Sequence, residues 1–248
     1  MIVLVTGATS GFGWAIAHRY VRAGAKVVAT GRRAERLAEL KAELGENLLP
    51  LTLDVRDRAA VGAAIAGLPE PFAAVEVLVN NAGLALGLEP ADRASLDDWD
   101  QMIDTNVKGL VYITRALLPG MVERGRGHVV NMGSVAASYP YPGGNVYGGS
   151  KAFVRQFSLN LRADLVGRGV RVTDIEPGLC GGTEFSTVRF HGDADKAAGV
   201  YAGAQPLTAE DIAESVFWVT SLPAHVNVNT LELMPTCQAA GPLAVVRG

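Results

Sequence analysis

The sequence predicts an α/β fold in which helices cover both faces of a parallel sheet. Short runs rich in Val, Ile and Leu alternate with stretches of helical apolar spacing along the chain. A glycine-rich turn joins the first of these runs to the first helix. No linker, repeat or low-complexity segment interrupts the alternation. We therefore expect a single domain over residues 1–248, with a doubly wound sheet.

The composition disfavours several classes of protein. The 248 residues are 49% hydrophobic and 19% charged, which allows a sizeable core. A formal net charge of -3 gives no basic patch for nucleic acid, and no apolar run approaches the roughly 18 residues of a membrane helix. Two cysteines and four scattered histidines indicate neither a disulfide framework nor a metal site. We expect a cytoplasmic protein without metal, nucleic-acid or membrane partners.

The expected elements follow one another in a regular order. Strands are expected at residues 2–5, 26–30, 48–55, 75–79, 128–134, 170–175 and 226–234. Helices are expected at about residues 11–24, 37–44, 58–68, 95–117, 147–165 and 209–222. Residues 179–207 look irregular and rich in glycine, and long loops of that kind beside a site are often lids.

The glycine-rich turn at residues 6–13, TGATSGFG, predicts a phosphate-binding site. Glycine permits positive φ and lets the backbone approach a pyrophosphate, which a helix N-terminus also attracts. Glycines alone are weak support, but their position between the first strand and the first helix makes the prediction strong. The turn contains Gly7, Thr9, Ser10, Gly11, Phe12 and Gly13.

The end of the second strand predicts the type of cofactor. That position should reach the adenosine ribose, where an acidic residue would bind a 2′-hydroxyl. This chain has Arg32 and Arg33 there instead, and guanidinium groups suit a 2′-phosphate. A merely solvated basic helix start is less favoured, because a helix N-terminus repels cations. NADP is therefore predicted over NAD.

Four further residues are candidates for catalysis. Tyr147 and Lys151 lie four residues apart, so on a helix they project from nearly the same face. A cation there would lower the phenol pKa and make Tyr147 a general acid or base, although a surface pair has the same spacing. Ser134 ends a strand, where open α/β sheets place ligand groups. Asn106 lies in an apolar helical stripe, where a buried amide must be hydrogen-bonded.

Together these motifs resemble the short-chain dehydrogenase/reductase family over essentially the whole chain. The marks of the family are TGATSGFG at 6–13, Asp54-Val55, Asn80-Asn81-Ala82-Gly83, Asn106, Ser134, Tyr147-x-x-x-Lys151 and Pro177-Gly178. The resemblance implies a Rossmann-type domain with a seven-stranded parallel sheet, a homotetramer, and NADP(H) as cofactor. It implies cofactor contacts from the glycine-rich turn and from Arg32, Arg33, Asp54, Val55, Asn81, Ala82, Gly83, Tyr147, Lys151, Pro177 and Gly178.

The same resemblance implies a distinct role for each of the four candidate catalytic residues. Tyr147 would exchange the proton of the substrate hydroxyl, and Ser134 would hydrogen-bond the substrate oxygen. Lys151 would lower the pKa of Tyr147 and hold the nicotinamide ribose. Asn106 would anchor a water that links Lys151 to solvent. The apolar stripe of Phe153 and Phe157 is compatible with a subunit contact.

Longer phrases such as RVTDIEPGLCGGTEFSTVRF resemble a branch of the family that acts on small 3-hydroxy acids. The substrates implied are serine, L-allo-threonine and 3-hydroxypropionate, oxidised at the 3-hydroxyl or formed from the 3-oxo compound. Their carboxylate needs a cation or amide donors, and Arg189 is the candidate, although a solvated loop charge is at least as good an explanation. A 3-oxoacyl reductase, a broad carbonyl reductase and an NADP-binding regulator without turnover remain alternatives.

Overall fold

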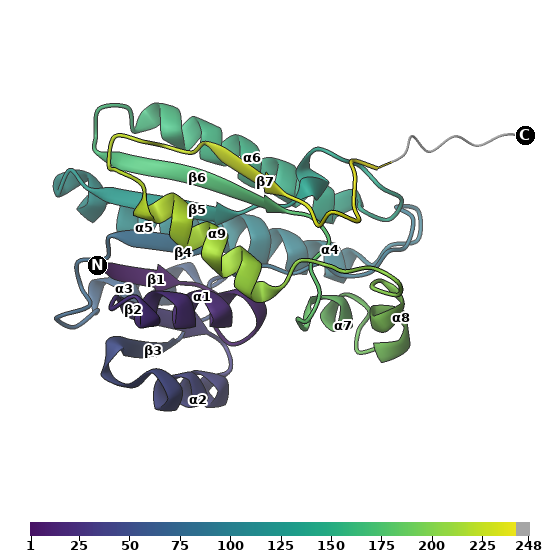
Figure 1. Ribbon diagram of the computed structural model, residues 1–248, viewed down its shortest axis with the longest axis horizontal. Helices are drawn as coiled ribbons and strands as arrows, with labels where there is room; N and C mark the ends of the chain where they lie inside the picture. The colour runs from purple at the N-terminus through teal and green to yellow at the C-terminus, as the bar shows by residue number, and fades with distance from the viewer. Residues whose placement is uncertain (242–248) are drawn as a thin grey trace, which may run out of the picture.

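The computed structural model describes residues 1–241, and residues 242–248 lie outside the described part. One parallel sheet has the strand order β3-β2-β1-β4-β5-β6-β7, which confirms the predicted α/β class and seven-stranded sheet (Figure 1). Its strands are β1 Ile2–Val5, β2 Lys26–Gly31, β3 Leu48–Thr52, β4 Val77–Asn80, β5 Gly127–Met132, β6 Val170–Pro177 and β7 Thr230–Leu233. The C-terminal tail after Thr236 is described only as far as residue 241.

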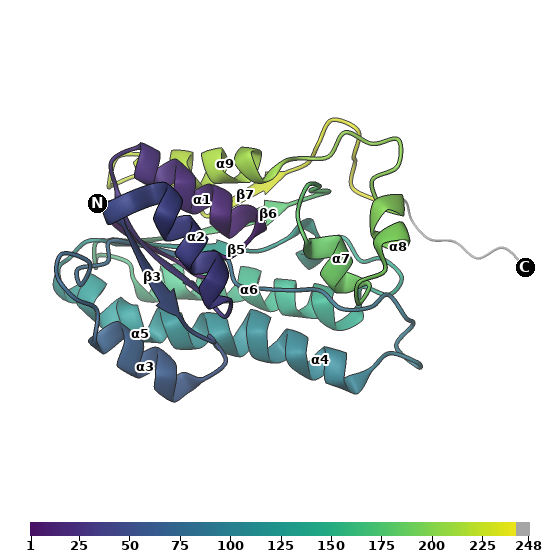
Figure 2. The ribbon, with the colours of Figure 1, turned by 90° about the horizontal axis from the view of Figure 1, so that it is seen from below.

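Helices cover the sheet in two layers. They are α1 Gly11–Arg22, α2 Ala34–Leu44, α3 Arg58–Ala66, α4 Leu96–Ile103, α5 Leu110–Glu123, α6 Asn145–Asp164, α7 Phe185–Arg189, α8 Ala194–Gly199 and α9 Ala209–Ser221. Figure 2 shows α1, α2 and α9 on one face and α3, α4, α5 and α6 on the other. The short helices α7 and α8 lie beyond one end of the sheet, beside the cleft described below (Figure 1).

The first strand shows why the sheet needs both layers. Val3 and Val5 face the cluster that α1 and α9 complete, whereas Leu4 faces the opposite cluster with Ile113 of α5. All four side chains are fully buried. A parallel sheet buried on both faces reads as a continuous apolar run, as β1 does. In the part of the chain that the structure describes, no helix is long and apolar enough to cross a membrane.

The two edge strands, β3 and β7, are three or more residues shorter than predicted, because side-chain hydrogen bonds replace the backbone pairing of the sheet there. After Thr52 the carboxylate of Asp54 accepts the backbone N–H of Arg56 at 3.0 Å, which turns the chain out of the sheet. At the other edge, Asn227 pairs through its amide with the N–H and C=O of Val172, both at 2.8 Å. The backbone of β7 therefore pairs with β6 only from Thr230 onward.

Two other predictions were also wrong in detail. The helix predicted from Ser95 is not uniform, because a π-helical turn at Asp104–Gly109 separates α4 from α5 and contains Asn106. Residues 179–207 are not wholly irregular, since they contain α7 and α8. The side chain of Asp193 caps α8 by accepting the N–H of Lys196.

Candidate active site

The glycine-rich turn brings the start of α1 against the end of β4. Gly7 has φ +66, and a methyl group there would lie 2.9 Å from Cα of Ala82. A methyl group at Gly13 would lie 2.3 Å from the carbonyl oxygen of Gly7. The amide of Asn81 donates to the carbonyl of Thr6 at 2.9 Å and to that of Gly7 at 3.1 Å. Glycine is required at both positions because backbone occupies the space a side chain would need.

The first turn of α1 is suited to an anion. Ser10 is its N-cap, but the serine side chain makes no capping hydrogen bond. The first backbone N–H groups of a helix have no partner within the helix and carry a partial positive charge. These donors open toward a cleft of about 790 Å³ at the carboxyl ends of the strands.

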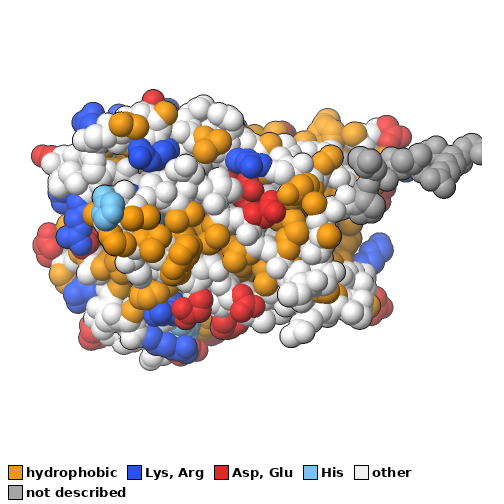
Figure 3. Space-filling view, turned by 45° about the horizontal axis from the view of Figure 1, so that its top comes forward, with side chains coloured by type: hydrophobic (Ala, Val, Ile, Leu, Met, Phe, Trp, Pro, Cys, Tyr) orange, Lys and Arg blue, Asp and Glu red, His pale blue; other side chains and the backbone are white. Residues whose placement is uncertain are grey.

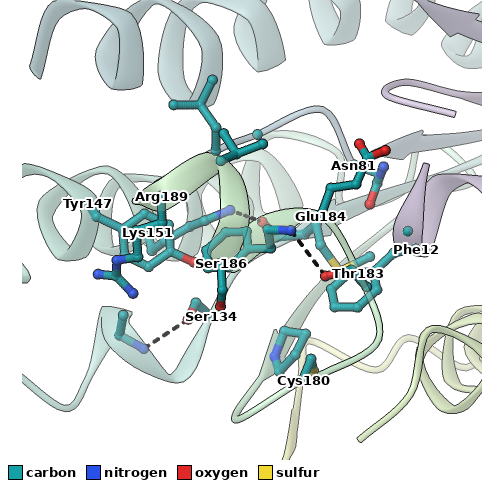
Figure 4. A pocket seen from close by; sticks show the side chains of 18 of the residues that line it. Phe12, Asn81, Ser134, Tyr147, Lys151, Cys180, Thr183, Glu184, Ser186 and Arg189 are labelled. Atoms are coloured by element: carbon teal, nitrogen blue, oxygen red, sulfur yellow. Dashed lines mark hydrogen bonds between the residues drawn. The ribbon is translucent and has the colours of Figure 1, made fainter. Parts of the chain in front are cut away.

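The cleft gathers nearly all the residues that the sequence predicted. It is lined by Gly7, Thr9, Ser10, Gly11, Phe12, Arg32, Arg33, Asp54, Val55, Asn81, Ala82, Gly83, Ser134, Tyr147, Lys151, Pro177, Gly178 and Arg189. Gly13 and Asn106 do not line the cleft, and both are buried. Figure 4 shows Tyr147, Lys151 and Arg189 grouped together, with Phe12 and Asn81 at the other side of the view.

At the adenosine end, the two predicted arginines differ. Arg33 donates to the backbone and hydroxyl oxygens of Thr9 at 3.1–3.3 Å. Its guanidinium also forms a two-pronged ion pair with Glu184, at 3.2 and 2.9 Å. Arg32 is exposed at the rim. Arg36 was missed; it lies one helical turn after Arg33 and donates to the carbonyl of Thr9 at 3.4 Å.

Ser134, Tyr147 and Lys151 come together where β5 ends and α6 begins. Tyr147 and Lys151 occupy the first two turns of α6, and both are buried. The ammonium of Lys151 donates to the carbonyl of Met132 at 2.7 Å and lies 5.8 Å from the centroid of the Tyr147 ring. Ser134 follows β5 by two residues, and its hydroxyl accepts the backbone N–H of Ala136 at 3.1 Å and lies near enough to the phenol of Tyr147 to affect its pKa.

Burial dominates the electrostatics of this group. Burial raises the pKa of Tyr147 to about 12, although the hydroxyl of Ser134 and the charge of Arg189 lower it in part. Burial lowers the pKa of Lys151 to about 8, and the charge of Asp174 opposes that shift. The expectation of a lowered Tyr147 pKa is therefore wrong for the chain alone, because desolvation of a phenolate outweighs the nearby cations. At neutral pH the phenol holds its proton.

Asn106 supports this group from behind. Its side-chain oxygen accepts the N–H of Leu84 at 2.9 Å, and its amide donates to the carbonyl of Leu84 at 2.9 Å and to Ser150 at 3.0 Å. The side chain thus ties the segment after β4 to the residue next to Lys151. The buried amide of Asn106 is satisfied, as predicted.

Helix α7 brings a cation next to Tyr147. Arg189 of α7 donates to the hydroxyl of Tyr141 at 2.5 Å, and its guanidinium carbon lies 5.5 Å from the centroid of the Tyr147 ring. Phe185 packs edge-on against Tyr147, with the ring centroids 5.9 Å apart. Tyr141 and Glu184 were missed, because their contacts join segments far apart in the sequence.

The cleft fits NADP(H) on these observations. The uncapped start of α1 suits a diphosphate, and Arg33 with its neighbours suits a 2′-phosphate. Arg33 follows β2, whereas Lys151 and Tyr147 lie at the end of β5, three strands away in the sheet, where the reacting ring would have to reach. In the described part of the chain, no cluster of His, Cys, Asp or Glu is placed to hold a metal ion.

The buried lysine yields a stability prediction. The folded-state pKa of Lys151 is about 8, below the value of about 10.4 in an unfolded chain, so the buried charge destabilises the fold at pH 7. Lys151→Met should therefore raise the free energy of unfolding by about 1–3 kcal/mol at pH 7. The gain should shrink toward about pH 10, where the lysine is neutral in the native protein.

Urea unfolding of both proteins at the two pH values measures this difference. A gain that does not depend on pH would show that packing, and not the buried charge, is responsible.

Comparison with known proteins agrees with the geometry. The family model described as short chain dehydrogenase matches residues 1–193. An NADP-dependent 3-hydroxy acid dehydrogenase of Salmonella typhi is 66% identical over 247 residues, which cover 100% of both chains. A serine 3-dehydrogenase of Rhizobium radiobacter is 55% identical over 245 residues, covering 99% of this chain and 98% of that one.

A solved structure, the closed form of serine dehydrogenase complexed with NADP+, is similar over 100% of both chains. It superposes with a TM-score of 0.99 at 64% sequence identity. The chain therefore belongs to the short-chain dehydrogenase family.

Proposed function

We propose that the protein is an NADP-dependent dehydrogenase of small 3-hydroxy acids such as serine, L-allo-threonine and 3-hydroxypropionate. The observation that carries the substrate class is Arg189, a lid cation 5.5 Å from the ring of Tyr147. A guanidinium can bind a carboxylate through two hydrogen bonds while the 3-hydroxyl faces the phenol. The names of the relatives, 3-hydroxy acid dehydrogenase and serine 3-dehydrogenase, support the same class.

The proposed chemistry divides the alcohol's two hydrogens between cofactor and protein. NADP(H), when bound, accepts or supplies the hydride on the carbon that bears the oxygen. Tyr147 takes the hydroxyl proton in oxidation and gives it back in reduction, and Ser134 hydrogen-bonds the same oxygen. Lys151 holds the nicotinamide ribose. General acid–base catalysis of this kind contributes about 10²–10⁴ in rate.

We also propose the setting in which the protein works. Residues 1–248 are taken as one dinucleotide-binding and catalytic domain, with residues 179–207 as its substrate loop, in a cytoplasmic homotetramer. An apolar band crosses the face that carries α6, β7 and α9, which supports association (Figure 3). On α6, Phe153 is 38% exposed and stacks on Phe157 with the ring centroids 5.7 Å apart.

Rates with a panel of substrates test the substrate class. NADP-linked oxidation of L-serine, L-allo-threonine and 3-hydroxypropionate should be measured beside NADPH-linked reduction of a 3-oxoacyl thioester analogue. We expect a higher kcat/KM for the free acids, because only they present a carboxylate to Arg189. A clear preference for the thioester would favour a 3-oxoacyl reductase, and no turnover of any compound would favour a regulator.

The contribution of Arg189 is tested within the same panel. Arg189→Ala should raise KM for L-serine by about 10–100-fold, because the substrate loses the binding free energy of a charge-assisted hydrogen bond. KM for serine methyl ester, which lacks the charge, should change by less than about threefold. Lys196→Ala is the matched control, since Lys196 is an exposed cation of the same loop paired with Asp193 at 3.4 Å. Equal effects on both substrates would remove Arg189 from carboxylate binding.

Cofactor preference gives a separate prediction at the other end of the cleft. Arg33→Ala should weaken NADPH binding by about 10–100-fold and NADH binding by less than about threefold, because only NADPH carries the 2′-phosphate. Arg22→Ala is the control, since it removes an equal charge from the far end of α1. Both dissociation constants can be followed by nucleotide fluorescence. Parallel losses for the two cofactors would contradict the role of Arg33.

A further inference from the structure

Two carboxyl groups are completely buried on β6, outside the set of residues used above. Asp174 and Glu176 are both 0% exposed, and they project from the same face because they are two residues apart on a strand. Within residues 1–241, none of their four oxygens has a hydrogen-bond partner. Two buried carboxyl groups that influence each other's pKa disfavour a negative charge on both.

This pair lies directly behind Lys151. A methyl group at Gly133 would lie 2.5 Å from Oδ1 of Asp174, so the carboxyl group touches the backbone at Gly133. The preceding residue, Met132, provides the carbonyl that accepts the ammonium of Lys151 at 2.7 Å. The carboxyl of Asp174 and the ammonium of Lys151 therefore contact adjacent residues of one segment, and both side chains are buried.

Other charged groups face the pair from the elements packed on it. From α6, Arg155 places Nε 3.5 Å from Oε1 of Glu176. From β7, Glu232 is the register neighbour of Glu176, and it accepts a hydrogen bond from the hydroxyl of Tyr139 at 3.3 Å. The groups that set the charge here are Lys151, Arg155, Asp174, Glu176, Glu232 and Tyr139.

Burial raises the pKa of Asp174 to about 8, the charge of Glu176 raises it as well, and the charge of Lys151 lowers it. Burial also raises the pKa of Glu176, and the charge of Arg155 opposes that shift. At neutral pH Asp174 therefore holds its proton. Asp174 loses its proton in the same pH range in which burial would take the proton from Lys151.

We propose that Asp174 is a positioning residue for the reaction, whose carboxyl group keeps Lys151 protonated as the pH rises above neutrality. As the pH rises, Asp174 releases its proton to solvent and becomes a carboxylate near the ammonium. No proton moves between substrate and protein in this deprotonation. Lys151 then keeps the charge with which it holds the nicotinamide ribose. The proposal rests on that role of Lys151 in the proposed function.

The test compares Asp174→Asn with Glu176→Gln from about pH 6.5 to about pH 9.5. Asparagine resembles the protonated acid, so Asp174→Asn should bind NADPH as the wild type does at about pH 6.5. As the pH is raised, the variant should lose affinity for NADPH about one pH unit below the wild type. At about pH 9 its Kd for NADPH should be about tenfold higher than that of the wild type. The alkaline limb of the pH profile of kcat/KM should shift by the same amount. Glu176→Gln is the matched control, and it should show no such downward shift because Asp174 remains.

Infrared difference spectra keep the proposal testable if Asp174→Asn does not fold. The wild type should lose a protonated-carboxyl C=O band between about pH 7 and about pH 9, and Glu176→Gln should lose it at lower pH. The proposal is overturned by the absence of that band, by an equal loss of affinity at every pH in Asp174→Asn, or by the same alkaline shift in both variants. NADPH binding and infrared spectra do not depend on the substrate, so failure of the proposed substrate class is seen separately.

Discussion

The active site depends on one buried cation, the ammonium of Lys151 bound to the carbonyl of Met132 at 2.7 Å. This contact joins the first turns of α6 to the end of β5, and so fixes Tyr147 relative to Ser134. The charge is costly to bury, and its surroundings supply the compensation. Asn106 donates a hydrogen bond to Ser150, the residue before Lys151, and the carboxyl of Asp174 lies nearby. These contacts hold Lys151 in place although burial penalises its charge.

The sequence predicted the parts of this arrangement that depend on local pattern. The turn at residues 6–13 and the spacing of Tyr147 and Lys151 follow from glycine conformation and helical periodicity, and both lie where expected. Contacts set by the register of distant strands were not predictable. Asp174 comes near Lys151 only because β6 pairs with β5 so that Asp174 lies opposite Asn131. The pairing of Arg33 with Glu184 likewise joins residues 151 positions apart.

The wrong expectation for the pKa of Tyr147 has the same origin. Sequence spacing shows that a cation lies near the phenol, but not that both groups are removed from water. Burial raises the pKa of Tyr147 to about 12, so at neutral pH the phenol is an acid ready to protonate a developing alkoxide. Oxidation of an alcohol requires the phenol to part with its proton, and rising pH favours that direction.

The central claim is that the phenol of Tyr147 carries the substrate proton. Tyr147→Phe removes one hydroxyl from the cleft, and Tyr139→Phe removes another whose partner is Glu232. Turnover of L-serine and NADPH affinity should be measured for both. The account predicts that Tyr147→Phe lowers turnover by about 10²–10⁴-fold with NADPH affinity within about threefold, and that Tyr139→Phe retains turnover. Turnover close to that of the wild type in Tyr147→Phe would contradict it.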